Sequence, residues 1–234
     1  LGLSALTAGS VLFPGCRTLL RDFEEEAFSR AREHFKAFRF GASNRVLATL
    51  AVSPRARWRK AACAHFVSVS PLADAGARSV LIASLRYADT APYALHALAR
   101  LGWAEAGGRI VKALEGERSP ERVAEYLRGL ASTGLDRYVA AALPRVHAHH
   151  HDVRVAALDV LSRTRGGGPE AVAALRRRLD DPGEARYLRL LAAKGLATRS
   201  DGSGFALALG TIRDVALPRV KTGDPGLDED LVAM

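Results

Sequence analysis

Residues 152–161 read Asp-Val-Arg-Val-Ala-Ala-Leu-Asp-Val-Leu, and residues 92–102 read Pro-Tyr-Ala-Leu-His-Ala-Leu-Ala-Arg-Leu-Gly. In both stretches apolar residues recur three positions apart, as Leu95, Leu98 and Leu101 do. Residues at this spacing lie on one side of an α-helix. Each stretch therefore predicts a helix with one apolar stripe that a neighbouring element must cover.

The apolar stripe recurs along the chain, with steps of 29, 31 and 30 residues in each of three columns. A fourth column, with steps of 29, 29 and 32 residues, marks a second helix in each unit. The four columns are Leu95, Ala124, Val155 and Ala185; Leu98, Leu127, Leu158 and Leu188; Leu101, Leu130, Leu161 and Leu191; and Leu85, Leu114, Leu143 and Leu175. The pattern predicts pairs of helices repeated every thirty residues or so.

Turn and capping residues separate these helices. Ser119 before Pro120 is a suitable N-cap followed by proline at the first helical position, and Gly102 and Gly134 stand where the turns should be. We expect first helices over 92–102, 120–131, 152–163 and 184–195, and second helices over 73–87, 105–116, 135–148 and 170–179. Looser apolar spacing around Trp58 predicts one further unit over 55–88.

Helix pairs with a period near thirty residues are typical of an α-solenoid, because each pair buries its apolar face only against the next pair. The stretches at 92–102 and 152–161 resemble the first helix of a compact, bacterial HEAT-like repeat. The resemblance implies an all-α fold, a right-handed α-α superhelix of paired antiparallel helices over 55–215. It also implies that the second helices line a concave face that binds partners, through basic residues that would be Arg78, Arg86, Arg109, Lys112, Arg137, Arg145, Arg176 and Arg177.

The composition agrees with a folded helical protein. Of 234 residues, 43 are alanine and 32 leucine, both strong helix formers. The hydrophobic content of 48% excludes disorder as the main state, and two cysteines exclude a disulfide-stapled scaffold. The net charge of +9 leaves nucleic acid open as a partner, although 29 of the 34 basic residues are arginine, as in chains from GC-rich genomes.

The N-terminal segment 1–16 is apolar and has two interpretations. Residues 1–13 carry no charge, and Cys16 follows them, as in the lipid-attachment site of a bacterial lipoprotein. In this case Cys16 is a lipidation site, the anchor is the only membrane contact, and the protein lies in the cell envelope. The alternative is a buried helix that ends at Pro14-Gly15 in a cytoplasmic protein, which we favour.

The segments that flank the repeats have different compositions. Residues 17–54 contain five of the eight phenylalanines, and the spacing over 18–39 predicts an amphipathic helix. We interpret this segment as helices that cap the repeats, since a solenoid needs covered ends. Residues 216–234 are rich in proline, glycine and acid, and predict an irregular tail.

Three clusters suggest chemistry. His147, His149, His150 and His151 are four of the seven histidines, and such tracts can bind zinc, nickel or copper. We instead favour a solvated connector at this position. The run from Arg55 to Lys60 could bind phosphates while Trp58 stacks on a base, but an amphipathic helix with Trp58 facing inward is the simpler interpretation. Arg176 to Arg178 predicts a solvated face, and Cys63 predicts a small buried side chain.

The sequence predicts no cofactor and no catalytic set. HEAT-like DNA glycosylases are similar in length and charge, but their aspartate with tryptophans has no counterpart around Trp58 or Trp103. HEAT-like phycobilin lyase subunits are another similar group, without a recognisable chromophore site here. The resemblance implies a non-enzymatic scaffold that binds a protein through its concave face. The alternative is a nucleic-acid-binding HEAT-like protein of DNA repair, and the oligomeric state stays open.

Overall fold

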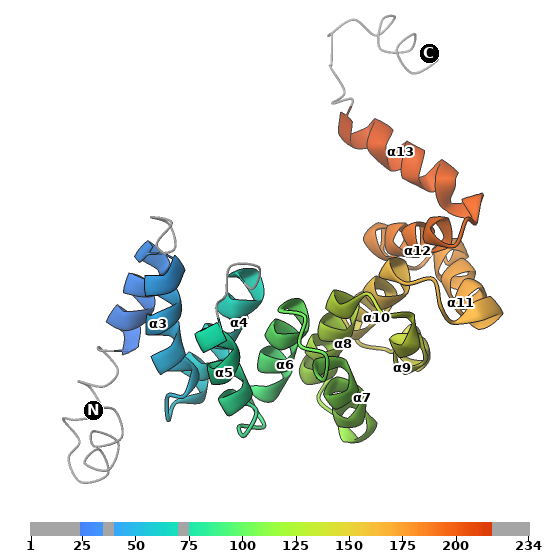
Figure 1. Cartoon of the computed structure of the whole chain (residues 1–234). Coiled ribbons are helices and arrows are strands. Elements are labelled where there is room, and N and C mark those ends of the chain that lie inside the picture. The colour runs from blue at the N-terminus through green and yellow to red at the C-terminus, as the bar shows by residue number, and fades with distance from the viewer. Residues whose placement is uncertain (1–23, 35–39, 70–74, 217–234) are drawn as a thin grey trace, which may run out of the picture.

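The computed structural model of the chain describes residues 24–34, 40–69 and 75–216 (Figure 1). Within these ranges every element of regular secondary structure is a helix, so the predicted all-α class is confirmed. Residues 24–34 are helical. The helices that follow are α3 (Phe40–Ala51), α4 (Ala56–Val69), α5 (Ala75–Ser84), α6 (Ala91–Arg100), α7 (Ala106–Gly116), α8 (Pro120–Thr133), α9 (Val139–Ala142), α10 (His151–Arg163), α11 (Gly168–Asp180), α12 (Arg186–Thr198) and α13 (Phe205–Ala216).

The predicted first helices correspond to α6, α8, α10 and α12, and most predicted second helices to α5, α7 and α11. The expected cap is present, because the Ser119 hydroxyl accepts a hydrogen bond from the Arg122 N–H. Gly134, the predicted turn residue, ends α8 with φ 62°, which a residue with a side chain rarely adopts. One expected apolar position is exposed: Ala185 precedes α12, because this helix begins two residues later than predicted.

The continuous helix expected over 135–148 is absent and is replaced by three short pieces. The 3-10 helix η2 (Asp136–Tyr138) leads into α9, and the 3-10 helix η3 (Leu143–Arg145) follows it. Pro144 explains the break, because proline has no N–H for the helical ladder and its ring collides with the preceding turn. The side chain of Arg145 then donates to the carbonyl oxygens of Leu114 and Ala141, at 2.9 and 2.7 Å.

The helices form two rows (Figure 1). The central row consists of α4, α6, α8, α10 and α12, and each of these helices contacts the next one in the row. The flanking row consists of α5, α7, α9 and α11, and each of these contacts the central-row helix that follows it along the chain. The core runs continuously between the rows and along the central row, and none of the described helices is long and apolar enough to cross a membrane.

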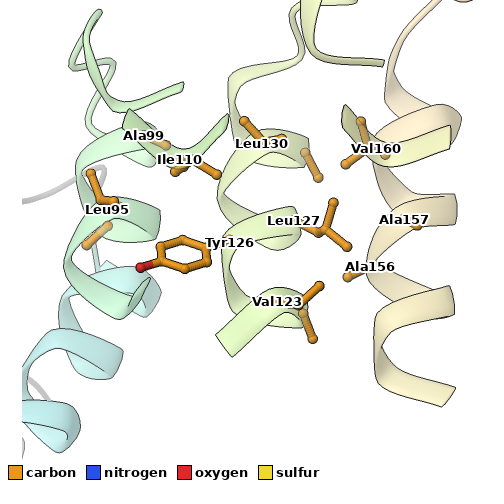
Figure 2. Close-up of a cluster of buried hydrophobic side chains, with 14 of the residues drawn as sticks. Leu95, Ala99, Ile110, Val123, Tyr126, Leu127, Leu130, Ala156, Ala157 and Val160 are labelled. Atoms are coloured by element: carbon orange, nitrogen blue, oxygen red, sulfur yellow. The ribbon is translucent and has the colours of Figure 1, made fainter. Parts of the chain in front are cut away.

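The leucine column in the middle of the central row is completely buried, at Leu98, Leu127, Leu158 and Leu188. Figure 2 shows the side-chain packing at α8, where Leu127 and Val123 point toward Ala156 and Ala157 of α10 while Tyr126 points toward α6. Large side chains on one helix therefore meet alanines on the next, which lets the two helices pack closely.

Glycines bring the central-row helices into backbone contact. A Cβ on Gly129 of α8 would lie 3.2 Å from the Cα of His96 in α6, and a Cβ on Gly195 of α12 would lie 3.4 Å from the Cα of Ser162 in α10. These four positions are thirty-three residues apart in succession. The same close approach therefore recurs along the row.

The N-terminal end of the row is closed by residues 24–34 and α3. Trp58 of α4 is buried against Phe28, with ring centroids 5.6 Å apart. This confirms the inward interpretation of Trp58. The expected segment 1–16 with Cys16, and the expected tail beyond Ala216, lie outside the described residues.

Cys63 of α4 is completely buried, as predicted, and burial raises the pKa of its thiol to about 12. Because the thiolate is the reactive form, we expect Cys63 in a Cys16→Ser variant to resist dithionitrobenzoate at pH 8 while the protein is folded. In denaturant the same thiol should react fully. Stoichiometric labelling of the folded variant would contradict this burial.

Candidate functional site

The eight basic residues that the sequence proposed as a binding surface all belong to the flanking row or its turns. Seven of the eight are exposed, and Arg145 alone is half-buried. Five of them make local contacts: Arg145 binds backbone carbonyls, Arg176 binds Asp201 at 2.7 Å, Arg109 pairs with Glu105, and Arg86 and Arg137 lie over the rings of Tyr87 and Tyr138.

The two rows follow a curve whose ends, at α3 and α13, rise on the same side (Figure 1). The central row lies inside this curve and the flanking row outside it. The sequence analysis expected the second helices on the concave side, whereas in Figure 1 the inner side of the curve carries α6, α8, α10 and α12.

We define the inner surface by eight exposed or half-buried side chains of these four helices, in pairs seven residues apart on each helix. The first member of each pair is Tyr93, Glu121, Asp152 or Tyr187, and the second is Arg100, Arg128, Asp159 or Lys194. Tyr187 is 58% exposed. Three acidic and three basic residues thus stand between two tyrosines. Reasoning from the sequence missed this surface because it assigned the other row to the concave side.

A buried polar cluster lies beneath the inner surface, between α6 and α8. His96 Nδ1 lies 2.6 Å from Glu125 Oε1, and His96 Nε2 lies 3.1 Å from Ser132 Oγ. Arg128 donates to the second oxygen of Glu125 at 3.0 Å. Burial alone would raise the pKa of Glu125, but hydrogen bonds and charge from His96 and Arg128 outweigh burial and lower it.

The order Ser132, His96, Glu125 matches the connectivity of a nucleophile, a base and an orienting carboxylate. The surroundings differ from those of a hydrolase site, because the Ser132 hydroxyl donates to the Arg128 carbonyl at 3.0 Å. Ser132 also lies in the last turn of α8, where free carbonyls and the negative end of the helix dipole would repel an oxyanion. The cluster instead joins α6 to α8 as a polar clamp.

The histidine run lies between η3 and α10, with His151 as the first residue of α10, and all four histidines are exposed. His147 Nδ1 accepts a hydrogen bond from Arg178 at 2.9 Å. Burial, followed by the charges of Arg178 and Arg177, lowers the pKa of His147. The described residues contain no group of three or more side chains placed to hold a metal ion. The His147 side chain thus contacts a guanidinium group, and the carbonyl oxygen of His149 accepts a hydrogen bond from Arg154 at 2.8 Å.

Two residues of the predicted basic run, Arg55 and Arg59, also contact other parts of the fold. Arg59 is buried, and it donates to both Asp89 carboxylate oxygens and to the carbonyls of Ser53 and Pro54. Arg55 pairs with Glu24 at 2.9 Å. Arg178, expected on a solvated face, is likewise only 14% exposed and pairs with Glu184.

The chain matches no protein-family model, and no curated protein matches its sequence. The candidate function therefore rests on the geometry of the inner surface and on the packing of the two rows.

Proposed function

We propose that this chain is a HEAT-like α-solenoid, a right-handed superhelix of helix pairs, that acts as a non-enzymatic scaffold. It binds a protein partner through the inner surface. Polar contacts between residues about thirty positions apart support the repeat assignment. Arg59 contacts Asp89, His96 contacts Glu125, and Arg154 contacts Glu184, so each unit binds the next in a similar way.

The observation that carries the proposal is the make-up of the inner surface. Tyrosine is enriched among residues that dominate binding energy in protein interfaces, because it offers a large rigid side chain with one polar end. Tyr93 and Tyr187 stand at the two ends of this surface, with charges of both signs between them. Such a surface suits a protein partner whose facing surface carries both positive and negative side chains.

Nucleic acid fits the inner surface less well. A groove for DNA presents mainly basic residues to the phosphates, whereas Glu121, Asp152 and Asp159 occupy half of the charged positions here. Arg128 is further paired with Glu125 on the same helix. We expect labelled duplex DNA to show no binding at 150 mM salt, measured by fluorescence polarisation. Tight binding that weakens steeply with salt would favour the nucleic-acid alternative.

Site-specific photocrosslinking in the native host tests the proposal. The crosslinker p-benzoylphenylalanine, which carries a benzoyl group where tyrosine has its hydroxyl, replaces Tyr93 or Tyr187 on the inner surface. The matched controls carry it in place of Lys112 or Arg177, which are exposed on the flanking row. We expect one protein to be captured from both inner positions and not from either control.

Two results would overturn this function. Capture of the same protein only from the flanking-row controls would move the binding face to the outside of the curve. Capture of nucleic acid rather than protein from Tyr93 and Tyr187 would show that the partner is a nucleic acid.

A further inference from the structure

The helix of residues 24–34, which closes the N-terminal end of the row (Figure 1), makes only a small apolar contact. Its buried residues are Glu24, Ala27 and Ala31, and alanine side chains bury little apolar surface. Phe28 is the one large apolar residue between positions 24 and 34, and it is half-buried. Ser43 of α3 adds a hydrogen bond to the Ala31 carbonyl oxygen at 2.8 Å. Apolar packing alone therefore attaches this helix weakly.

Charged side chains supply much of the remaining attachment. The Glu24 carboxylate accepts hydrogen bonds from the Ser53 hydroxyl and from Arg55, the latter at 2.9 Å. Glu25 pairs with Arg57 of α4 at 3.4 Å, where both side chains are exposed. A further charge at this contact can therefore change how firmly residues 24–34 are held.

His65 lies on α4 at this contact. It follows Trp58 by seven residues, so the two side chains lie on one side of α4. The Phe28 ring contacts both of them, with its centroid 5.6 Å from that of Trp58 and 6.4 Å from that of His65, edge to face. Arg32 follows Phe28 by four residues and lies on the same side of its helix. His65 therefore faces an aromatic ring and a guanidinium group of residues 24–34.

The surroundings of His65 disfavour a positive charge on it. Burial, followed by the charge of Arg32, lowers the pKa of His65 below its ordinary value of 6.5. The acidic residues Glu24 and Glu25 are already paired with arginines at the start of this contact. The other helices that pack on α4 are α3, α5 and α6. They carry ionised side chains of positive sign, all exposed: Arg45, Arg78 and Arg100. The histidine of α6, His96, is paired with Glu125 of α8.

We propose that residues 24–34 form an acid-released cap: protonation of His65 places a second positive charge beside Arg32 and loosens this helix from α4. At neutral pH the cap is attached and covers Trp58. In acid it is released, and the N-terminal end of the row is exposed. This device does not depend on the partner that binds the inner surface.

The direction of the effect follows from proton linkage. Since the pKa of His65 is lowered while the cap is attached, the released state binds the proton more readily. Acid therefore favours release, and the attachment weakens as the pH falls through the ordinary value of 6.5. The Arg32 side chain is exposed, so salt should screen its share of the effect.

Amide hydrogen exchange of the purified full chain at low salt, compared at pH 7.5 and pH 5.5, tests the cap. After correction for the intrinsic rate at each pH, we expect opening of residues 24–34 to increase at least about threefold in acid. The amides of α8, inside the row, should keep the same protection at both pH values.

Three variants identify the group responsible. His65→Gln is neutral at both pH values and should abolish the acid response of residues 24–34. Arg32→Gln changes an exposed side chain and should reduce the response, because the burial of His65 remains. His150→Gln is the matched control, since His150 is exposed between η3 and α10, and it should leave the response intact.

Several results would overturn the proposal. One is equal protection of residues 24–34 at both pH values in the wild type. Another is an acid response that persists in His65→Gln, which would assign it to a different group such as His34. An Arg32→Gln variant that responds as strongly as wild type, or equal opening of α8 in acid, would likewise contradict a cap released through His65 and Arg32.

Discussion

Gly129→Val is expected to lower the free energy of unfolding by about 3 kcal/mol, the upper end for overpacking a core. A Cβ at this position would lie 2.7 Å from Ile110 Cδ1 and 3.2 Å from the Cα of His96. The Ile110 side chain can rotate away, but the backbone of α6 must shift. This shift would separate the two helices that His96 and Glu125 hold together.

Urea denaturation followed by circular dichroism at 222 nm measures the effect. Gly108→Val is the matched control, because Gly108 is exposed in α7 and a Cβ there meets nothing within 4 Å. The control should change the unfolding free energy by less than about 0.5 kcal/mol, as is usual for surface substitutions. Equal effects of the two substitutions would show that the central-row helices are not in backbone contact.

Glu184→Gln is expected to lower the free energy of unfolding by about 3 kcal/mol, because it leaves two half-buried guanidinium groups without a full counter-charge. Glu184 is only 4% exposed, and both of its oxygens bind Arg154 at 3.0 and 3.1 Å. Arg178 adds a third bond at 2.9 Å. The carboxylate therefore joins α10 and α11 to the start of α12. Thermal unfolding of Glu184→Gln beside Glu115→Gln, an exposed residue of α7, measures the loss.

The pH dependence of the same variant gives a second readout. Burial would raise the pKa of Glu184, but hydrogen bonds from Arg154 and the Ala185 N–H, with the charges of Arg154 and Arg178, lower it below the ordinary value of 4.5. A carboxylate with a lowered pKa stabilises the fold above its unfolded pKa and loses this effect as the pH falls through the folded value. The difference in unfolding free energy between wild type and Glu184→Gln should therefore be constant above pH 4.5 and shrink below it. A difference in unfolding free energy that grows as the pH falls would contradict this role of Glu184.

Local patterns predicted most of the helices, because apolar spacing, N-caps and turn glycines act over a few residues. Leu127 and Ser119 are examples, each buried or capping as its sequence context indicates. The break at Pro144 was visible in the sequence too, but the apolar spacing on both sides of it suggested a continuous helix.

Contacts between units could not be predicted from a single sequence. His96 stands in a leucine-rich stripe, and only the packing of α6 on α8 shows that Glu125 covers it. Arg59 and Arg178 look like surface charges until the helix ends they bind are known. A thirty-residue period also does not specify which helix of each pair lies inside the curve. Figure 1 shows α6, α8, α10 and α12 on the inner side.

Among the described helices, α6, α8 and α10 of the central row each contact the row helix before them and the row helix after them. In a row of this kind, small changes at successive interfaces add up along the row. A small rotation at each of the three interfaces between α6 and α12 adds to the next, so the separation of Tyr93 and Tyr187 can change by far more than any single contact does. If the proposed protein partner binds there, the inner surface can open or close around it while every helix keeps its neighbours.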